Sequence, residues 1–503
     1  MNDQTHRRGT PMNRCRFRRI RLISTIVAFL GLGLCAAVAP AAEGPLLRYT
    51  GALRPLPPAA ESAGESAQAV AYRQPAGPVP SVAPPGDDRF SGRVPIETAV
   101  QYALANNPEI QAARYRARAL GARVPQAASL PDPMLMTSIF LESIETAAGP
   151  QEVALSLSQK FPWFGKRGLR SQVAYHEAMA AYARVTALEL QVMERVKRAY
   201  YDVYFLQHAI DVVRTLEPRL ADVREIARTK VETSKAGLES VLRVEVELSG
   251  LATRIVELEQ TKTDAQARLA TLLHLPPDAR IEAVPVAARS EVGRTARLLV
   301  DLAEAYQPEL QARRREVARD QTSVDLACRE YWPDVTVGFN WFEMGSQGLS
   351  PVATGDDAYA LAVGVNLPIY RGRLDAAVRE SRYNTMRSRR EYSAALDRVR
   401  GDVEALYARF QEHDRILAIL GSEIIPRAER TLELSIEAYR LDKLSFQQLI
   451  DTYRTLLNYR IDFHKREALR EQIVASLERA VGTTVTGGPA AGAQADSPAP
   501  PAP

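Results

Sequence analysis

Cysteine and histidine are scarce in this sequence, with three cysteines and six histidines among 503 residues. Cys15 and Cys35 lie in an N-terminal leader that we expect to be removed, so Cys328 alone would remain and no disulfide could form within the mature chain. The histidines beyond the leader are His176, His208, His274, His413 and His464. They lack paired-ligand spacing, and there is no CxxC motif and no glycine-rich phosphate loop. We therefore expect no enzymatic activity, no cofactor and no metal site.

Long apolar runs are also missing, with one exception at the N-terminus. Residues 22–38 form an apolar run that follows five closely spaced arginines and ends in small residues near Ala39 and Ala41. This order is typical of a secretory signal peptide, which we place at residues 1–42, and Met12 would also start a signal of ordinary length. Beyond it, no run in the sequence is long enough for a transmembrane helix.

The basic charge of the chain belongs to this leader. It holds seven arginines and one aspartate, so its removal changes the formal net charge from +4 to −2. We therefore expect no nucleic acid as a partner.

The leader also contains a possible lipidation site. Residues 32–35, Leu-Gly-Leu-Cys, resemble a lipoprotein cleavage box, although the bulky Leu34 departs from that pattern. Lipidation of Cys35 and ordinary cleavage near Ala41 or Ala42 are the two alternatives.

Most of the remaining chain is an internal repeat. Residues 108–112, Pro-Glu-Ile-Gln-Ala, recur as Pro-Glu-Leu-Gln-Ala at 308–312, and further matches follow at offsets that grow from 200 to 208. Each repeat is predicted to contain a helix, two strands and two long helices. We place the repeats at 93–285 and 293–484, between a disordered Pro/Ala-rich linker at 43–92 and a disordered Pro/Ala tail at 485–503.

Four short segments are predicted to be strands. Residues 153–158, 335–341 and 359–367 alternate large apolar with small or polar side chains, whereas 134–141 is apolar on both faces. This alternation fits the wall of a transmembrane β-barrel, and it also fits a half-buried antiparallel sheet. Four strands cannot close a barrel and leave exposed edges, so three chains would be needed to supply twelve strands.

Apolar residues at three- and four-residue spacing predict long coiled-coil helices around 185–213, 241–258 and 396–410. We expect two helices of roughly fifty residues in each repeat, near 75 Å apiece at about 1.5 Å per residue. Pro218 and Pro426 occupy equivalent positions and predict a kink or break between the two helices. The expected fold class is mainly α with a small β part.

These features together resemble a known family. The Asn-Pro-Glu-Ile motif at 107–110, the Phe-Pro-Trp-Phe-Gly-Lys-Arg-Gly stretch at 161–168 and the duplicated helical hairpin are similar to the outer-membrane efflux proteins of the TolC type. The likeness covers residues 94–482, and the stretch at 161–168 most resembles the heavy-metal and cation efflux branch.

The resemblance implies a TolC-like α-barrel of long antiparallel coiled-coil helices, continued by a twelve-stranded β-barrel in a homotrimer. Such a protein is a passive duct in the outer membrane of a Gram-negative-type envelope and extends into the periplasm. It would export metal ions, drugs or other small molecules, with a periplasmic adaptor protein and an inner-membrane pump as partners and outer-membrane lipid around its strands.

Two strand-to-helix turns carry proline, glycine and positive charge at the expected mouth of the barrel. They contain Pro162, Gly165, Lys166 and Arg167 in the first repeat, and Pro368, Gly372 and Arg373 in the second. Proline ends strand pairing, glycine permits a sharp turn, and the charges would meet lipid phosphates or water. A plain turn with solvated charges is the simpler interpretation.

The resemblance assigns a periplasmic gate to the helical turn at residues 438–451. The candidate gate residues are Tyr439, Asp442, Gln448, Asp451 and, from the equivalent turn of the first repeat, Arg243. Tyr439 and Asp451 match the family's tyrosine and one inner aspartate, whereas Gln448 stands where a second aspartate is often found. A contact between Arg243 and Asp451 would join adjacent hairpins, and ordinary polar residues on a solvated helix tip are the alternative.

Two further functions fit part of this sequence. One is a periplasmic coiled-coil adaptor or scaffold, which gives no reason for four strands with a lipid-compatible face. The other is the outer-membrane channel of a protein secretion system, which would share the fold and differ in cargo.

Overall fold

The computed structural model describes residues 92–233, 237–276, 278–285, 289–346, 351 and 354–485. The predicted signal peptide, Met12, Cys35 and nearly all of the predicted linker and tail lie outside these residues. The first half contains β1 (Gly92–Val94), α1 (Ile96–Asn106), α2 (Pro108–Ala128), β2 (Met134–Thr146), β3 (Gly149–Phe161), α3 (Lys166–Glu232), α4 (Leu238–Leu273) and β4 (Ile281–Ala283). The second half contains α5 (Ala296–Tyr306), α6 (Pro308–Arg329), β5 (Val335–Met344), β6 (Ala358–Val365), α7 (Arg371–Ile419), the π-helix η2 (Leu420–Ile424), α8 (Ile425–Arg440) and α9 (Phe446–Val481).

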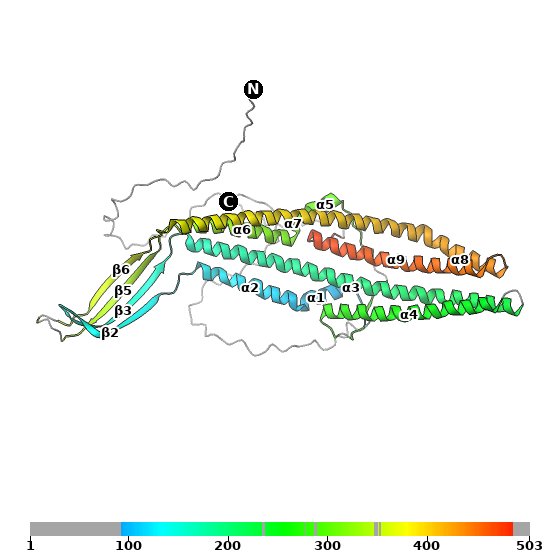
Figure 1. Ribbon diagram of the computed structural model, residues 1–503, viewed down its shortest axis with the longest axis horizontal. Helices are drawn as coiled ribbons and strands as arrows, with labels where there is room; N and C mark the ends of the chain where they lie inside the picture. The colour runs from blue at the N-terminus through cyan, green and yellow to red at the C-terminus, as the bar shows by residue number, and fades with distance from the viewer. Residues whose placement is uncertain are drawn as a thin grey trace, which may run out of the picture. The chain divides into compact units, whose positions relative to one another are not determined.

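The same order of two shorter helices, a strand pair and a helical hairpin occurs twice (Figure 1). The expected fold class, mainly α with a small β part and four strands in one sheet, is therefore confirmed.

Each half begins with two helices that meet at a capping residue. The Asn107 side chain accepts hydrogen bonds from two backbone amides in the first turn of α2, at 2.8 and 3.2 Å. Pro108 fills the first position of α2, where no amide donor is required. Gln307 caps α6 in the same way through the Leu310 amide at 3.0 Å, ahead of Pro308. The repeated sequence motif thus ends one helix and starts the next.

The four predicted strands form one antiparallel sheet in the order β2-β3-β5-β6. Leu135 pairs with Leu157, Leu157 with Phe339, and Phe339 with Leu361. Directly paired side chains share a face, so one face of the sheet carries large apolar residues on every strand. β2, whose alternation was unclear from sequence, adds Leu135 and Ile139 to this face. The opposite face contains Ser156, Ser158, Gly338, Asn340, Ala360 and Ala362, together with the larger Met134, Met136 and Phe342.

The apolar face of the sheet is exposed in the single chain. Leu361 is 74% exposed and Ile139 is 71% exposed, and other large apolar side chains of this face are also open. β2 and β6 form the two edges, and within the described part of the chain each pairs with a single strand. The sheet therefore presents a wide apolar surface and two unpaired edges, which single soluble chains avoid.

Two helical hairpins follow the strand pairs, with α3 packed on α4 and α8 packed on α9 (Figure 1). α3 is continuous over 67 residues, which is about 100 Å at 1.5 Å per residue. The predicted helix length of roughly fifty residues is wrong for three helices, because α3 is longer and α4 and α9 have 36 residues each. Across the described ranges, no helix combines the length and apolarity needed to cross a membrane.

The predicted break at Pro218 is wrong, because Pro218 lies inside the continuous α3. Leu216 and Leu220 are buried on either side of it, so packing maintains the helix across the missing hydrogen bond. At the equivalent place in the second half, α7 gives way to η2, and Pro426 lies in the first turn of α8. The chain reverses between α3 and α4 and between α8 and α9, well beyond either proline.

A second, parallel sheet of two strands was missed in the sequence. β1 pairs with β4, residue for residue from Gly92 with Ile281 to Val94 with Ala283. Tyr200 of α3 fixes both strands, since its hydroxyl donates to the Val94 carbonyl and accepts from the amide after β4, at 2.9 Å each. Strands of three residues have too little periodicity to be recognised in a sequence.

Candidate functional site

The tip of the second hairpin is a tight turn with a fully formed helix cap. Asp442 has a positive φ of 58°, and Ser445 is the N-cap of α9. The side-chain oxygen of Gln448 accepts hydrogen bonds from the Ser445 backbone amide at 3.2 Å and from the Ser445 hydroxyl at 2.9 Å. In return, the backbone amide of Gln448 donates to the Ser445 hydroxyl at 3.3 Å. Gln448 is thus part of a capping box, so its side chain already has a structural role at this turn.

Lys230, near the end of α3, connects the tips of the two hairpins. Its Nζ lies 2.6 Å from Oδ1 of Asp442, donates to the Tyr439 carbonyl, and sits 4.1 Å from the centroid of the Tyr439 ring. The Lys230 side chain is only 10% exposed. A charged group this buried requires such partners, so the contact fixes one hairpin tip against the other.

Tyr439 is the aromatic centre of this connection. It is buried, its ring centroid lies 6.1 Å from that of Phe446, and burial raises its pKa above the usual value. Tyr439 and Asp442, two of the gate candidates, are therefore brought together by Lys230. Sequence reasoning missed Lys230, because a lysine in the last turn of a helix is ordinarily a solvated residue that favours the helix dipole.

Arg243 and Asp451 are exposed and have other partners in the single chain. Arg243 pairs with Glu239 one turn earlier in α4, and Asp451 accepts a hydrogen bond from Gln447 at 3.1 Å. Arg243 and Gln447 line the same groove of about 380 Å³ between α4 and α9. An Arg243–Asp451 contact does not occur within the described residues of one chain, and between neighbouring hairpins of different chains it stays a prediction.

A different ion pair crosses this groove. Arg454 of α9 donates to both carboxylate oxygens of Glu247 of α4, with one of the two distances at 3.3 Å. The two hairpins are thus joined at two levels, by Lys230 at the tip and by Arg454 farther along the helices.

The first strand-to-helix turn has a buried lysine at its centre. Gly165, with a φ of 85°, precedes α3, and the Lys166 side chain is 1% exposed. Its Nζ donates to Oδ1 of Asp334 and to the Trp332 carbonyl at 2.8 Å each, and to Glu330 at 3.3 Å. The expectation that Lys166 meets lipid phosphates or water is therefore wrong, since its charge is satisfied inside the chain.

Asp334 is the acceptor that organises this turn. Besides Lys166 it binds the Trp163 amide at 3.0 Å and Lys160 at 3.2 Å. Burial alone would raise the pKa of Asp334, but these hydrogen bonds outweigh it and bring the pKa down to about 2. The ring of Trp163 also stacks on Trp332 at 5.2 Å between centroids. The first and second halves of the chain are joined here.

Pro162 and Arg167 complete the first turn. Pro162 follows the last residue of β3, and the Arg167 Nε donates to the carbonyl of Ala128 at 2.7 Å. Positive charge facing solvent or lipid was predicted at this turn for both Lys166 and Arg167. Arg167 is exposed and so presents that charge, whereas Lys166 is buried.

The second strand-to-helix turn differs from the first. Gly372 and Arg373 are exposed and Pro368 is partly buried, and the Arg371 guanidinium lies 5.5 Å from the centre of the Tyr331 ring. Within the described residues no buried lysine and no carboxylate of this chain occupies the place that Lys166 and Asp334 take in the first turn.

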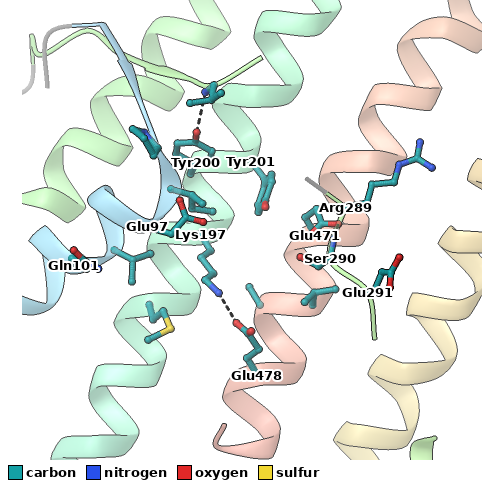
Figure 2. A pocket seen from close by; sticks show the side chains of 17 residues that line it. Glu97, Gln101, Lys197, Tyr200, Tyr201, Arg289, Ser290, Glu291, Glu471 and Glu478 are labelled. Atoms are coloured by element: carbon teal, nitrogen blue, oxygen red, sulfur yellow. Dashed lines mark hydrogen bonds and ion pairs between the residues drawn. The ribbon is translucent and has the colours of Figure 1, made fainter. Parts of the chain in front are cut away.

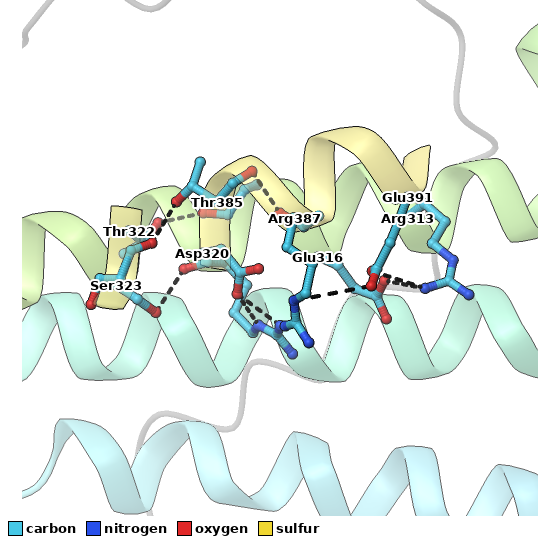
Figure 3. A network of polar contacts seen from close by, with 12 residues as sticks. Arg313, Glu316, Asp320, Thr322, Ser323, Thr385, Arg387 and Glu391 are labelled. Atoms are coloured by element: carbon cyan, nitrogen blue, oxygen red, sulfur yellow. Dashed lines mark hydrogen bonds and ion pairs between the residues drawn. The ribbon is translucent and has the colours of Figure 1, made fainter. Parts of the chain in front are cut away.

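A network of polar contacts joins α6 and α7 of the second half to α3 of the first half. Arg313 of α6 lies 3.2 Å from Glu316 and 3.5 Å from Glu391 of α7, while Arg184 of α3 pairs with Glu316. Figure 3 shows Arg313, Glu316 and Glu391 along the adjoining helices. Asp320 is buried and is held by its neighbour Arg319 at 2.8 Å. The Arg184–Glu316 and Arg313–Glu391 pairs join α6 to α3 and to α7, so these contacts are structural.

A cavity of about 830 Å³ lies between α1, α3 and α9 (Figure 2). Lys197 of α3 reaches across it to Glu478 of α9 at 2.5 Å, and Glu471 accepts from the Ser290 amide at 3.2 Å. Its aromatic wall includes Tyr201, whose pKa is raised by burial and by nearby carboxylates, Glu471 first. Sequence reasoning did not find this cavity, since its residues come from helices far apart in the chain. Over the described ranges no group of three or more His, Cys, Asp or Glu side chains is placed to hold a metal ion.

Comparisons with known proteins agree with this architecture. Residues 99–274 match the family model for outer membrane efflux proteins. The cobalt-zinc-cadmium resistance protein CzcC of Cupriavidus metallidurans is 19% identical over 403 residues, which cover 78% of this chain and 91% of that protein. The predicted family resemblance is thus confirmed.

Solved structures show the same fold. The outer-membrane channel OprN has a TM-score of 0.66 at 16% identity, covering 78% of this chain and 90% of its own. The outer membrane protein VceC from Vibrio cholerae has a TM-score of 0.65 at 18% identity, covering 78% and 96%. The chain therefore has the fold of these proteins.

Proposed function

We propose that this chain, whose residues 99–274 are those of an outer membrane efflux protein, is the outer-membrane channel component of a tripartite efflux system. The observation that carries the proposal is the exposed apolar face of the four-stranded sheet, attached to helices that run about 100 Å away from it. Strands of 8–13 residues match the span of a lipid bilayer. The helical hairpins would then extend into the periplasm.

The duct is a homotrimer. One chain supplies four strands with two unpaired edges, and three chains supply the twelve strands that a closed barrel needs. The small and polar face would line the interior, and the apolar face would meet outer-membrane lipid. A passive duct of this kind carries out no chemistry, so the residues of its turns and hairpin tips would position and gate it.

The gate is formed by the hairpin tips. Lys230, Tyr439 and Asp442 join the two hairpins of one chain, and Arg243 and Asp451 stand exposed where a neighbouring hairpin would pack. Release of these contacts would let the hairpins separate. A periplasmic adaptor protein and an inner-membrane pump supply the binding energy and the transport energy for that step.

The substrates are metal ions, drugs or other small molecules. The relationship to CzcC, whose name is that of a cobalt-zinc-cadmium resistance protein, favours divalent metal cations. Selection would belong to the inner-membrane pump, because the duct is passive and most residues of its lining are small or polar.

A periplasmic adaptor is the main alternative, and the exposed apolar sheet argues against it because an adaptor has no lipid to cover that face. A channel for protein secretion would have the same architecture and differ in its cargo.

Deletion and complementation test the proposal. A cell that lacks this protein is expected to become sensitive to cobalt, zinc or cadmium, and the full chain is expected to restore tolerance. The restored protein is expected in the outer-membrane fraction as a detergent-extracted trimer. Recovery as a soluble periplasmic monomer would refute the channel.

A further inference from the structure

The two strand pairs of the sheet are related by a fixed shift in residue number. Adding 202 to a residue of β2 and 206 to its partner in β3 converts the Met134–Ser158 pair into Thr336 and Gly364, which are partners in β5 and β6. The pair at the other end, residues 139 and 153, converts in the same way into 341 and 359, which are also paired. The strand pair β2–β3 and the strand pair β5–β6 therefore have the same register.

Two strand pairs can join edge to edge in two ways, β3 with β5 or β6 with β2, and within the chain the first of these is formed. β3 pairs with β5, whereas β6 and β2 are edges. Since β6 is equivalent to β3 and β2 is equivalent to β5, the edges have the same strand directions and the same pattern of faces as the strands that already pair. The β3–β5 junction is thus a template for a junction between β6 of one copy and β2 of another.

We infer that β6 of one subunit pairs antiparallel with β2 of the next in the register of the β3–β5 junction. The inference rests on the proposed trimer and specifies which residues meet in it. The Leu157–Phe339 pair translates into Val363 facing Thr137 of the partner subunit. The Leu155–Trp341 pair translates into Leu361 facing Ile139 of the partner subunit.

This register keeps the apolar face continuous across the junction. Leu361 and Val363 are 74% and 64% exposed on that face of β6, and Ile139 is 71% exposed on the same face of β2. A slip of one residue would turn Ile139 and its neighbours to the small and polar face. The apolar pattern therefore excludes odd shifts, and the internal template selects one of the remaining registers.

The same translation completes the second strand-to-helix turn. Asp334, which binds Lys166 in the first turn, is equivalent to Asp132 just before β2. Asp132 is exposed and has no ion pair among the described residues. The register places Asp132 of the partner subunit beside Arg371 and Arg373, which flank the glycine that replaces Lys166. The second turn is incomplete in one chain, and the neighbouring copy supplies its carboxylate.

Paired cysteines test the register. In a full-length Cys328→Ser chain, Thr137→Cys together with Val363→Cys is expected to close a disulfide-linked ring of three subunits upon mild oxidation in native outer membranes. The readout is the covalent trimer on a non-reducing denaturing gel. Thr137→Cys with Tyr359→Cys, four residues out of register, is expected to remain monomeric on the same gel.

The chain itself provides a matched control. Leu157→Cys with Phe339→Cys is the equivalent pair inside one subunit, so it is expected to form a disulfide without any oligomer band. Each single-cysteine variant is expected to stay uncross-linked. Native mass measurement of the parent chain establishes separately whether the trimer forms.

The outcomes separate two failures. A trimeric parent in which the 137/359 pair cross-links, or in which only the internal control pair does, overturns the register and leaves the channel standing. A disulfide-linked dimer of a single-cysteine variant would mean that β6 pairs with β6, or β2 with β2, of another subunit. That result overturns the register as well. A parent chain that never forms a trimer in the membrane overturns the proposed function itself.

Discussion

The Lys166–Asp334 contact gives a prediction whose size follows from the structure. The pKa of Asp334 falls from 3.8 to about 2 on folding. At about 1.4 kcal/mol per unit, the ionised carboxylate contributes about 2 kcal/mol to the free energy of unfolding. Because the folded-state pKa is the lower one, the contribution is complete above about pH 4 and is lost as the pH falls through about 2.

Asp334→Asn removes this charge and leaves the buried Lys166 without its strongest partner. We expect the variant to lose at least about 2 kcal/mol at pH 7, and up to about 3–5 kcal/mol if it behaves like a typical broken buried pair. The stacked Trp163 and Trp332 rings give a near-ultraviolet circular dichroism signal that can follow unfolding in detergent at fixed protein concentration.

The pH profile is the decisive measurement. Wild-type protein is expected to lose about 2 kcal/mol between pH 4 and pH 2 that Asp334→Asn does not lose. Asp222→Asn makes the same chemical change at an exposed aspartate of α3 and is expected to cost less than about 1 kcal/mol. Equal pH slopes for wild type and Asp334→Asn in this range would refute the assignment of the depressed pKa to this contact.

Three further predictions concern the gate, the helix cap and the sheet. Lys230→Met removes the ion pair with Asp442 and is expected to raise single-channel conductance in planar bilayers, whereas Lys230→Arg keeps the charge and should conduct like wild type. Gln448→Ala breaks the capping box and should cost about 1 kcal/mol in thermal unfolding without changing membrane insertion. Leu361→Lys places a charge on the proposed lipid face, which should destabilise the folded protein in the membrane by about 2–4 kcal/mol and so lower its yield. Ala360→Lys, on the opposite face, should assemble normally. Normal assembly of Leu361→Lys with failure of Ala360→Lys would mean that the faces are reversed.

The repeated elements could be predicted because their signals are local. Asn107 with Pro108 and Gln307 with Pro308 start helices through contacts within one turn, and period-two alternation identifies strands without any tertiary information. The ambiguous β2 was settled only by pairing, since Leu135 takes its face from its neighbour in β3. Local patterns thus determined the order of the elements, and pairing determined the faces.

The candidate sites were harder, because burial depends on residues far away in the chain. Lys166 looks like a surface charge in sequence and is buried by partners about 165 residues later. Lys230 is joined to Asp442 across 212 residues, and nothing next to it in the sequence marks that contact. Pro218 likewise failed to break its helix because the packing of distant helices outweighs one lost hydrogen bond.

The π-helix Leu420–Ile424 gives the second hairpin a mechanical property that the first lacks. α3 is one unbroken helix, whereas α7 and α8 meet at this wider turn, and extra residues of this kind are common where helices bend. The arm from that joint to the tip is α8, 16 residues or about 24 Å long. A bend of about 10° at the joint would move the Tyr439 end by about 4 Å, more than the length of a hydrogen bond. A hinge rotation of this size in the second helical hairpin of each chain would therefore be large enough to break the tip contacts without moving the strands.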